Sequence, residues 1–185
     1  MNLPLRRSSS VEQTLTMAIE QQPAPAAASF EALYRASAEA VFAYVASLLR
    51  DRSAAEEVTA AAFERAFRKR RSFDPRRGTQ RAWLFGIARN AALDELRRRQ
   101  RTAALTTEPA DTAAPDDEER RVARLTLRDA LAQLPPRERD LVALKFNGGL
   151  TNAELARVLG TSESNAGTLL HRTVTKLREA CHARR

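Results

Sequence analysis

The sequence predicts an all-α protein with two small helical modules joined by a flexible linker. Its 185 residues include only 6 glycines, and aromatic residues make up 5% of the chain. A chain dominated by alanine, leucine, arginine and glutamate favours helices over sheets. Apolar residues recur at helical spacing before and after residues 102–118 but not within them, so we expect one module on each side of this stretch.

The formal net charge of +8 predicts a polyanionic partner such as nucleic acid, because clustered Lys and Arg displace condensed counterions. A basic surface that is merely solvated is the alternative, and charge alone does not separate the two. The single cysteine, Cys181, allows no internal disulfide and fits a reducing cytoplasm. Residues 8–22 contain Glu12 and Glu20 instead of an apolar run, which predicts neither a signal peptide nor a membrane span. No Cys/His cluster has zinc-ligand spacing and no phosphate-loop motif occurs, so we expect no metal, no cofactor and no small-molecule substrate.

Residues 1–28 mix Ser, Gln, Pro and Ala, and this composition predicts a disordered N-terminal extension. The first module is predicted over residues 29–101. Its first helix begins near Phe30 and carries apolar residues at helical spacing up to Leu49. A second helix is expected to be capped by Ser53, with Glu56 three residues further on, and to end at the basic residues 68–71.

Pro75 and Gly78 mark a loop over residues 73–78. Thr79 then opens a long helix that ends at the arginine-rich residues 97–101. We interpret Gly86, inside this helix, as permitting close packing at a cost of about 1 kcal/mol relative to Ala.

Residues 102–118 contain Pro109, Pro115 and the beginning of an acidic run, and they are predicted to be an acidic linker. The acidic end is equally compatible with the start of the next helix, since carboxylates favour a helix N-terminus. The second module is predicted over residues 119–185.

The second module ends in a helix-turn-helix pattern. Thr151 and Glu154 have the spacing of a capping box, Gly160 ends that helix, and Thr161 and Ser162 begin the last one. The expected inner face of the last helix consists of Ala166, Leu170, Val174 and Leu177. Its outer face would enter the major groove of DNA, and the residues predicted to contact DNA there are Ser164, Asn165, Thr168, His171, Arg172 and Lys176. The alternative is a packed helical hairpin with a solvated outer face.

Two stretches resemble the extracytoplasmic-function (ECF) sigma factors of the sigma-70 family. The first is residues 83–98, WLFGIARNAALDELRR, which is similar to conserved region two. The second is LPPRER at residues 134–139 with GLT at 149–151, ELA at 154–156, LG at 159–160 and LHR at 170–172, which is similar to region four. The resemblance covers about residues 30–181.

This resemblance implies that residues 30–101 bind core RNA polymerase and the −10 element, and that residues 119–181 bind the −35 element. The residues that we expect at the polymerase are Glu56, Glu57, Phe63 and Phe67. The residues that we expect at the −10 element and the melted strand are Arg76, Arg77, Arg81, Trp83, Asn90, Arg97 and Arg98. Trp83 and Phe85 could stack on an unpaired base, although Trp83 is also a candidate for the core, and Asn90 could simply stabilise the helix surface.

The sequence departs from the family pattern at two places. Ala60 and Ala61 stand where the family commonly has Gln and an acidic residue, and Gly167 and Leu169 stand where the family is often basic. A helix-turn-helix regulator that does not act as a polymerase subunit therefore remains the alternative function, and an anti-sigma factor is an open alternative among the partners. Catalysis is not expected, because His171 and His182 have no acidic or cysteine neighbour arranged for it.

Overall fold

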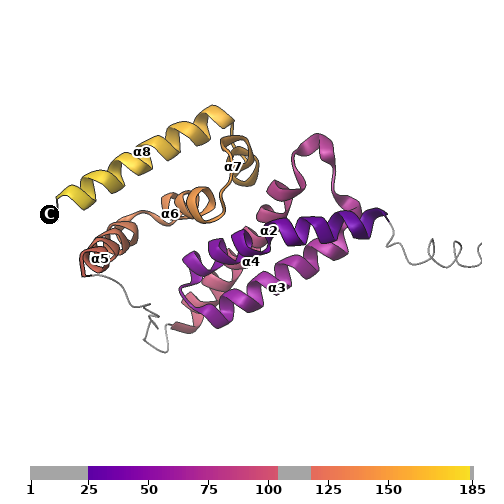
Figure 1. The fold of residues 1–185 in the computed structure, drawn as a ribbon, viewed down its shortest axis with the longest axis horizontal. Coiled ribbons are helices and arrows are strands. Elements are labelled where there is room, and N and C mark those ends of the chain that lie inside the picture. Colours follow the sequence, from indigo (N-terminus) through magenta and orange to yellow (C-terminus); the bar gives the residue numbers. More distant parts are fainter. Residues whose placement is uncertain (1–24, 104–117, 184–185) are drawn as a thin grey trace, which may run out of the picture.

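The computed structural model describes residues 25–103 and 118–183, and every regular element in these two stretches is helical (Figure 1). The all-α prediction is confirmed. Residues 1–24 of the predicted extension and residues 104–117 of the predicted linker lie outside the described residues. The elements are α2 Pro25–Leu49, α3 Arg52–Lys69, η1 Arg70–Ser72, η2 Pro75–Arg77, α4 Gln80–Ala103, α5 Glu118–Gln133, α6 Pro136–Val142, η3 Ala143–Asn147, α7 Asn152–Leu159 and α8 Glu163–His182.

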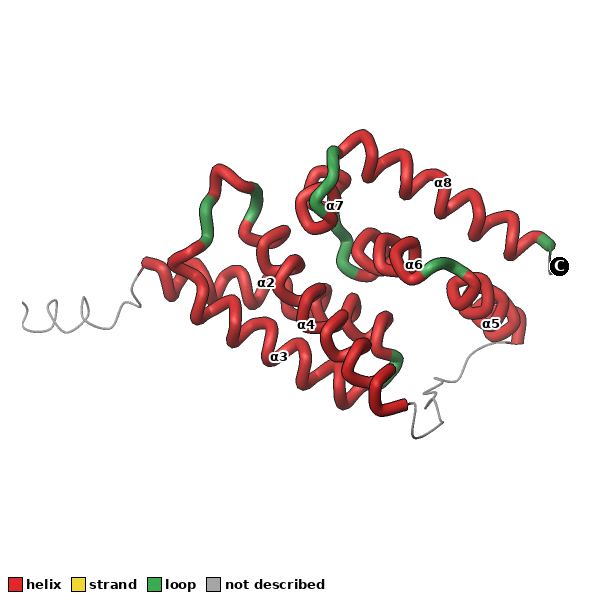
Figure 2. Tube along the Cα trace, turned by 180° about the vertical axis from the view of Figure 1, so that it is seen from behind, coloured by secondary structure: helices red, strands yellow, loops and turns green. Residues whose placement is uncertain are grey.

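The first module consists of α2, α3 and α4, which pack against one another (Figure 2). Small residues bring the helices close together: Ala55, Ala62 and Ala66 of α3 and Ala88 and Ala92 of α4 are all buried. Larger side chains of α2 fill the space between them, and those that are buried are Leu33, Val41, Tyr44, Val45 and Leu49. The apolar spacing read from the sequence is thus the inner face of this module.

Several helix boundaries differ from the prediction. Residues 102 and 103 of the predicted linker belong to α4, and Glu118 belongs to α5. α2 begins at Pro25, so the last four residues of the predicted extension are helical. The cap of α3 is Asp51 and not Ser53, because Asp51 accepts a hydrogen bond from the backbone N–H of Ala54 at 3.1 Å. Arg99 near the end of α4 also donates to Asp51, at 2.8 Å. The Ala54 bond first, and then the Arg99 bond, hold the pKa of Asp51 below its usual range.

The second module follows the predicted order of helices. Thr151 and Glu154 form the expected capping box at the start of α7, and Gly160 ends that helix in the left-handed conformation with φ 67°. Ser162 caps α8. The inner face of α8 is confirmed at Ala166 and Leu177, which are buried; Leu170 and Val174 are half-buried, and Thr173 is buried as well. α7 and α8 therefore form the predicted helix-turn-helix.

The two modules share one hydrophobic core in this structure. Leu84 and Phe85 of α4 are fully buried in the same cluster as Leu144, Leu150 and Leu155 of the second module. A Cβ added at Gly148 would lie 2.8 Å from Phe85 Cε1, which shows how closely α4 approaches the segment before α7. Apolar residues of both modules are thus buried against each other in this state.

Candidate nucleic-acid and protein interfaces

A cleft lies beside the loop between α3 and α4. Asp74 caps η2 by accepting a hydrogen bond from the Arg76 N–H at 3.0 Å, and Thr79 caps α4 by accepting one from the Ala82 N–H, also at 3.0 Å. These caps fix the loop where α4 begins. The cleft has a volume of about 490 Å³, and its lining includes Phe73, Arg77, Trp83, Gly86 and Asn90 from the first module and Arg157, Val158 and Gly160 from the second.

Trp83 is half-buried and tilts against Phe73, with 5.7 Å between the ring centroids, and both rings line the cleft. Trp83 therefore serves the packing of the module and also borders open space. Phe85 is fully buried, so the expectation that it could stack on a base is wrong. The close-packing interpretation of Gly86 is also wrong, because a Cβ there would meet nothing within 4 Å. Gly86 widens the cleft instead.

The predicted basic residues around the cleft differ in their contacts. Arg76 and Arg77 are exposed, and within residues 25–103 and 118–183 neither side chain forms an ion pair. Arg97 pairs with the exposed Asp94 at 3.1 Å. An exposed pair contributes about 0–1 kcal/mol, so a phosphate could replace Asp94 at little cost. Arg98 pairs with Glu95 at 2.7 Å, but the Glu95 side chain is only 11% exposed and also pairs with Arg99.

Arg81 differs from these exposed arginines because the second module already binds it. Its guanidinium donates to the carbonyl oxygens of Gly148 and Gly149 and lies 3.4 Å from the Glu154 carboxylate. In this arrangement Arg81 is not available to contact the melted strand, contrary to the expectation from the sequence.

The outer face of α8 presents the six residues predicted for DNA, and all of them are exposed. Three already have partners: Asn165 donates to Thr161 at 2.6 Å, Thr168 to the Ser164 carbonyl at 3.0 Å, and Lys176 to Glu138 at 2.5 Å. Within the described parts of the chain, the side chains of Ser164, His171 and Arg172 have no hydrogen bond or ion pair, so these three are the members of the set that are free to contact DNA.

Gly167 and Leu169 lie on the same helix. Leu169 is 39% exposed, and a Cβ at Gly167 would meet only Asn152 Nδ2, at the ordinary distance of 3.5 Å. Packing does not require either residue, so larger polar side chains could be accommodated at both positions.

The predicted polymerase surface lies on α3 but extends to α2. Phe67 is 42% exposed and meets Phe30 edge to face at 5.2 Å, and Tyr34 is 49% exposed. Phe63 is only 6% exposed and packs under Tyr34, so it supports this surface and is not part of it. The sequence prediction did not include Phe30 and Tyr34 in this surface, because it used them only as apolar positions of the first helix, although their i, i+4 spacing placed them side by side.

Glu56 and Glu57, the two acidic residues predicted for polymerase, are both exposed on α3. Glu56 pairs with Arg52 at 3.0 Å. Ala60 and Ala61 are exposed as well, so the two departures from the family pattern are surface positions that have no role in the core.

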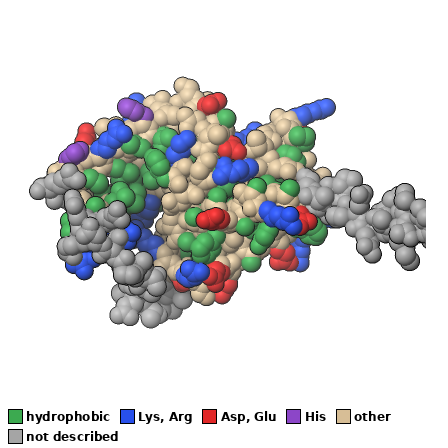
Figure 3. All heavy atoms as spheres, viewed as in Figure 1, with side chains coloured by type: hydrophobic (Ala, Val, Ile, Leu, Met, Phe, Trp, Pro, Cys, Tyr) green, Lys and Arg blue, Asp and Glu red, His purple; other side chains and the backbone are tan. Residues whose placement is uncertain are grey.

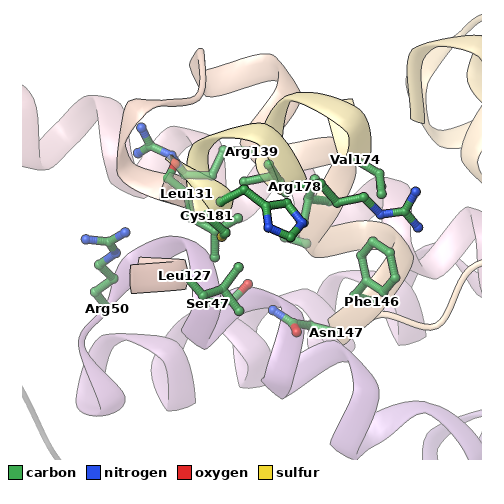
Figure 4. Close-up of a pocket in the computed structure, with 14 residues that line it drawn as sticks. Ser47, Arg50, Leu127, Leu131, Arg139, Phe146, Asn147, Val174, Arg178 and Cys181 are labelled. Atoms are coloured by element: carbon green, nitrogen blue, oxygen red, sulfur yellow. Dashed lines mark hydrogen bonds between the residues drawn. The ribbon is translucent and has the colours of Figure 1, made fainter. Parts of the chain in front are cut away.

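A second hollow, which we call the α8 groove, was not predicted. It has a volume of about 620 Å³ and is lined by apolar residues of α5, η3 and α8 together with the end of α2. Figure 4 shows Leu127, Leu131 and Phe146 around it, with Arg50 and Arg178 on opposite sides. In the surface view, apolar side chains gather below α8, near the two histidines (Figure 3). Residues from four separate segments build the groove, so no local sequence pattern indicated it.

Among the described helices, none combines the length and apolar character needed to cross a bilayer. Within the same residues, no group of three or more His, Cys, Asp or Glu side chains is placed to hold a metal ion.

Three features define a DNA-binding protein with two helical modules. They are the helix-turn-helix of the second module, the separate module formed by α2, α3 and α4, and the exposed basic residues. Comparison with known proteins agrees with this class: residues 33–102 match the sigma-70 region 2 family and residues 124–177 match sigma-70 region 4. The ECF RNA polymerase sigma factor SigL of Mycobacterium tuberculosis is 33% identical over 82% of this chain and 88% of its own. The RNA polymerase sigma factor CarQ of Myxococcus xanthus is 36% identical over 82% of this chain and 88% of its own.

Two solved structures have the same fold. The sigma factor RpoE of Bartonella quintana, solved with the anti-sigma factor NepR, matches with a TM-score of 0.67 at 21% identity, over 85% of this chain and 99% of RpoE. CnrH, solved with the cytosolic domain of CnrY, matches with a TM-score of 0.60 at 25% identity, over 83% of this chain and 88% of CnrH.

The chain belongs to the ECF sigma factors of the sigma-70 family. Members of this family are transcription initiation factors that act with core RNA polymerase, and they are not enzymes. Family membership resolves the choice between a sigma factor and a stand-alone regulator, because the region 2 match covers the module that a regulator would leave unexplained.

Proposed function

We propose that the first module captures the melted strand of the −10 element in the cleft beside the loop between α3 and α4, while α8 contacts the −35 element. The observation that carries this proposal is the cleft itself, where the Trp83 ring, the open side of Gly86 and the exposed Asn90 amide border one space. An aromatic ring can stack on an unpaired base, and an amide can both donate and accept hydrogen bonds. The exposed Arg76 and Arg77 lie next to this space, where they could contact the phosphates of the bound strand.

Promoter opening tests this proposal directly. Permanganate footprinting with Asn90→Ala, and separately with Arg76 and Arg77 both changed to Ala, should show loss of strand opening while binding to core polymerase is retained. Gln133→Ala removes an exposed amide far along the chain and should open the promoter normally. Normal opening by both cleft variants would place the base-binding site elsewhere on the module.

The polymerase surface follows from the aromatic residues on α2 and α3. We place it at Phe67, Tyr34 and Phe30, flanked by Glu56 and Glu57. An exposed apolar patch with charged neighbours is typical of a protein interface. The protein would act in the cytoplasm, where polymerase and promoters are found.

The α8 groove fits an anti-sigma factor. Its floor is apolar, and in the described part of the chain the side chains of Arg50 and Arg178 at its edges have no ion-pair partner. An amphipathic helix with acidic residues along its edges would complement both features. Leu127→Asp and Phe146→Asp, both at exposed positions, should abolish silencing by an anti-sigma factor selected against the wild-type protein. Silencing that survives both changes would exclude the groove.

A further inference from the structure

A buried carboxylate joins the two modules. Asp140 of α6 is only 2% exposed, and both of its side-chain partners come from the first module. The Tyr44 hydroxyl of α2 donates to Asp140 Oδ1 at 2.8 Å, and Arg89 of α4 donates to Oδ2 at 2.6 Å. Tyr44 is fully buried, and the Arg89 side chain is 24% exposed.

The contacts of Asp140 depend on closure of the modules. A carboxylate removed from water is strongly unfavourable unless it is paired and hydrogen-bonded. Here the pairing exists only while α2 and α4 lie against α6. Burial first, and then the adjacent Asp140 charge, raise the pKa of Tyr44 far above its ordinary value, so the phenol stays protonated and remains a donor.

The same closure covers the site proposed for the melted strand. Arg157 and Val158 of α7 form one wall of the cleft, and a Cβ at Gly78 would lie only 3.3 Å from Arg157 Cγ. Arg81 is bound to Gly148, Gly149 and Glu154. A strand entering the cleft would have to displace these contacts.

The closed arrangement is also too compact for a promoter. Elements centred near −10 and −35 lie about 25 base pairs apart, which is roughly 85 Å along B-DNA. Modules that share one hydrophobic core cannot occupy both elements at this spacing. The modules must therefore separate before both elements are bound.

We propose that the closed arrangement is a resting state and that Asp140, held by Arg89 and Tyr44, is the latch that sets the population of open molecules. The consequence for transcription rests on the proposed function, whereas the latch itself concerns only the free protein. Loss of the Asp140 charge leaves Arg89 without its partner and favours separation of the modules.

Single-molecule fluorescence energy transfer tests the latch in the full-length free protein. Dyes are placed at the exposed Ala36 and Ala123, each changed to Cys, in a Cys181→Ser background. Asp140→Asn and Arg89→Met should each raise the ratio of open to closed molecules at least about tenfold, since breaking a buried pair costs well over the 1.4 kcal/mol that corresponds to tenfold. Tyr44→Phe, which removes one hydrogen bond, should give a smaller increase in the same direction.

The matched control is Asp94→Asn, which removes a carboxylate whose partner, Arg97, lies on the same helix. It should leave the ratio unchanged. Circular dichroism identifies any variant that has lost its helices. Because Asp140 and Arg89 lie on different modules, the variant at one residue tests the latch if the variant at the other unfolds its own module. A wild-type ratio in a folded Asp140→Asn or Arg89→Met protein overturns the latch.

The assay contains no polymerase and no DNA, so its result does not depend on the proposed promoter contacts. An opened Asp140→Asn protein that fails to melt a promoter would count against the cleft assignment and leave the latch intact. Suppose instead that the Asp140→Asn protein melts a promoter but has the same fraction of open molecules as the wild type. This result would count against the latch alone.

Discussion

The hydroxyl of Thr79 donates a hydrogen bond to Glu154 Oε1 at 3.0 Å, and this contact joins the N-terminus of α4 to that of α7. Each residue also caps its own helix: Thr79 accepts from the Ala82 N–H, and Glu154 Oε2 accepts from the Thr151 N–H at 3.0 Å. The start of the proposed strand-binding helix and the start of the helix-turn-helix are therefore held by the same pair of side chains.

Acid should weaken this junction through Glu154. Burial raises the pKa of Glu154, but hydrogen bonds from Thr151 and Thr79 and the Arg81 charge together outweigh it, so the pKa is lowered. A lowered carboxyl pKa contributes stability above the unfolded value, about 4.3 for Glu, and this stability is lost as pH falls through the folded value. The free energy of unfolding of the wild type should therefore exceed that of Glu154→Gln at neutral pH, with a difference that shrinks below about pH 4. Urea unfolding at several pH values measures this difference, and a constant difference would contradict the assignment.

Gly86→Ala should stabilise the protein by about 1 kcal/mol, because alanine favours the helix and nothing lies within 4 Å of the new Cβ. Gly148→Ala should destabilise it by about 1–3 kcal/mol, because its Cβ would approach Phe85 Cε1 to 2.8 Å and the Leu144 carbonyl oxygen to 2.7 Å. Thermal unfolding of the two variants gives opposite shifts. A loss of stability in Gly86→Ala would show that the cleft side of α4 is packed.

Ala60→Gln combined with Ala61→Asp should strengthen binding to core polymerase. Both positions are exposed, so the change adds polar groups without disturbing the core. One or two new hydrogen bonds at about 0.5–1.5 kcal/mol each would raise affinity roughly two- to a hundredfold. Titration of labelled polymerase measures the change, with Ala36→Gln as a control at another exposed alanine. If the Ala60→Gln/Ala61→Asp protein and the wild type bind polymerase with equal affinity, the polymerase surface lies away from this part of α3.

Arg172→Ala should weaken DNA binding across sequences and lower the slope of log K against log salt by about one, because one phosphate contact is lost. Gly167→Arg should act in the opposite direction, since the position has room and the new charge lies on the same helix. Fluorescence anisotropy over a range of salt concentrations provides both slopes. Slopes equal to that of the wild type would move the DNA surface off the outer face of α8.

The sequence predicted the elements that local chemistry determines. Thr79 at the start of α4, the Thr151–Glu154 capping box and Gly160 at the end of α7 each depend on residues within a few positions of one another, and the structure has all three. The cap of α3 was misassigned because Ser53 and Asp51 are both suitable cap residues, and Arg99, which lies far along the chain, also binds Asp51.

Features that require tertiary contacts could not be predicted in this way. Asp140 is an ordinary surface residue by its local pattern, and only the approach of Tyr44 and Arg89 makes it a buried link. Phe63 and Phe67 share one helical stripe, and their different exposure follows from the position of Tyr34 on the neighbouring helix. The α8 groove has no local signal at all.

Run-off transcription from a genomic promoter library tests most directly whether this chain directs core RNA polymerase to promoters. With core polymerase and the purified protein, we expect discrete transcripts that are absent with core polymerase alone, and we expect the protein to co-elute with core polymerase. DNA binding without co-elution and without any protein-dependent transcript would contradict the claim.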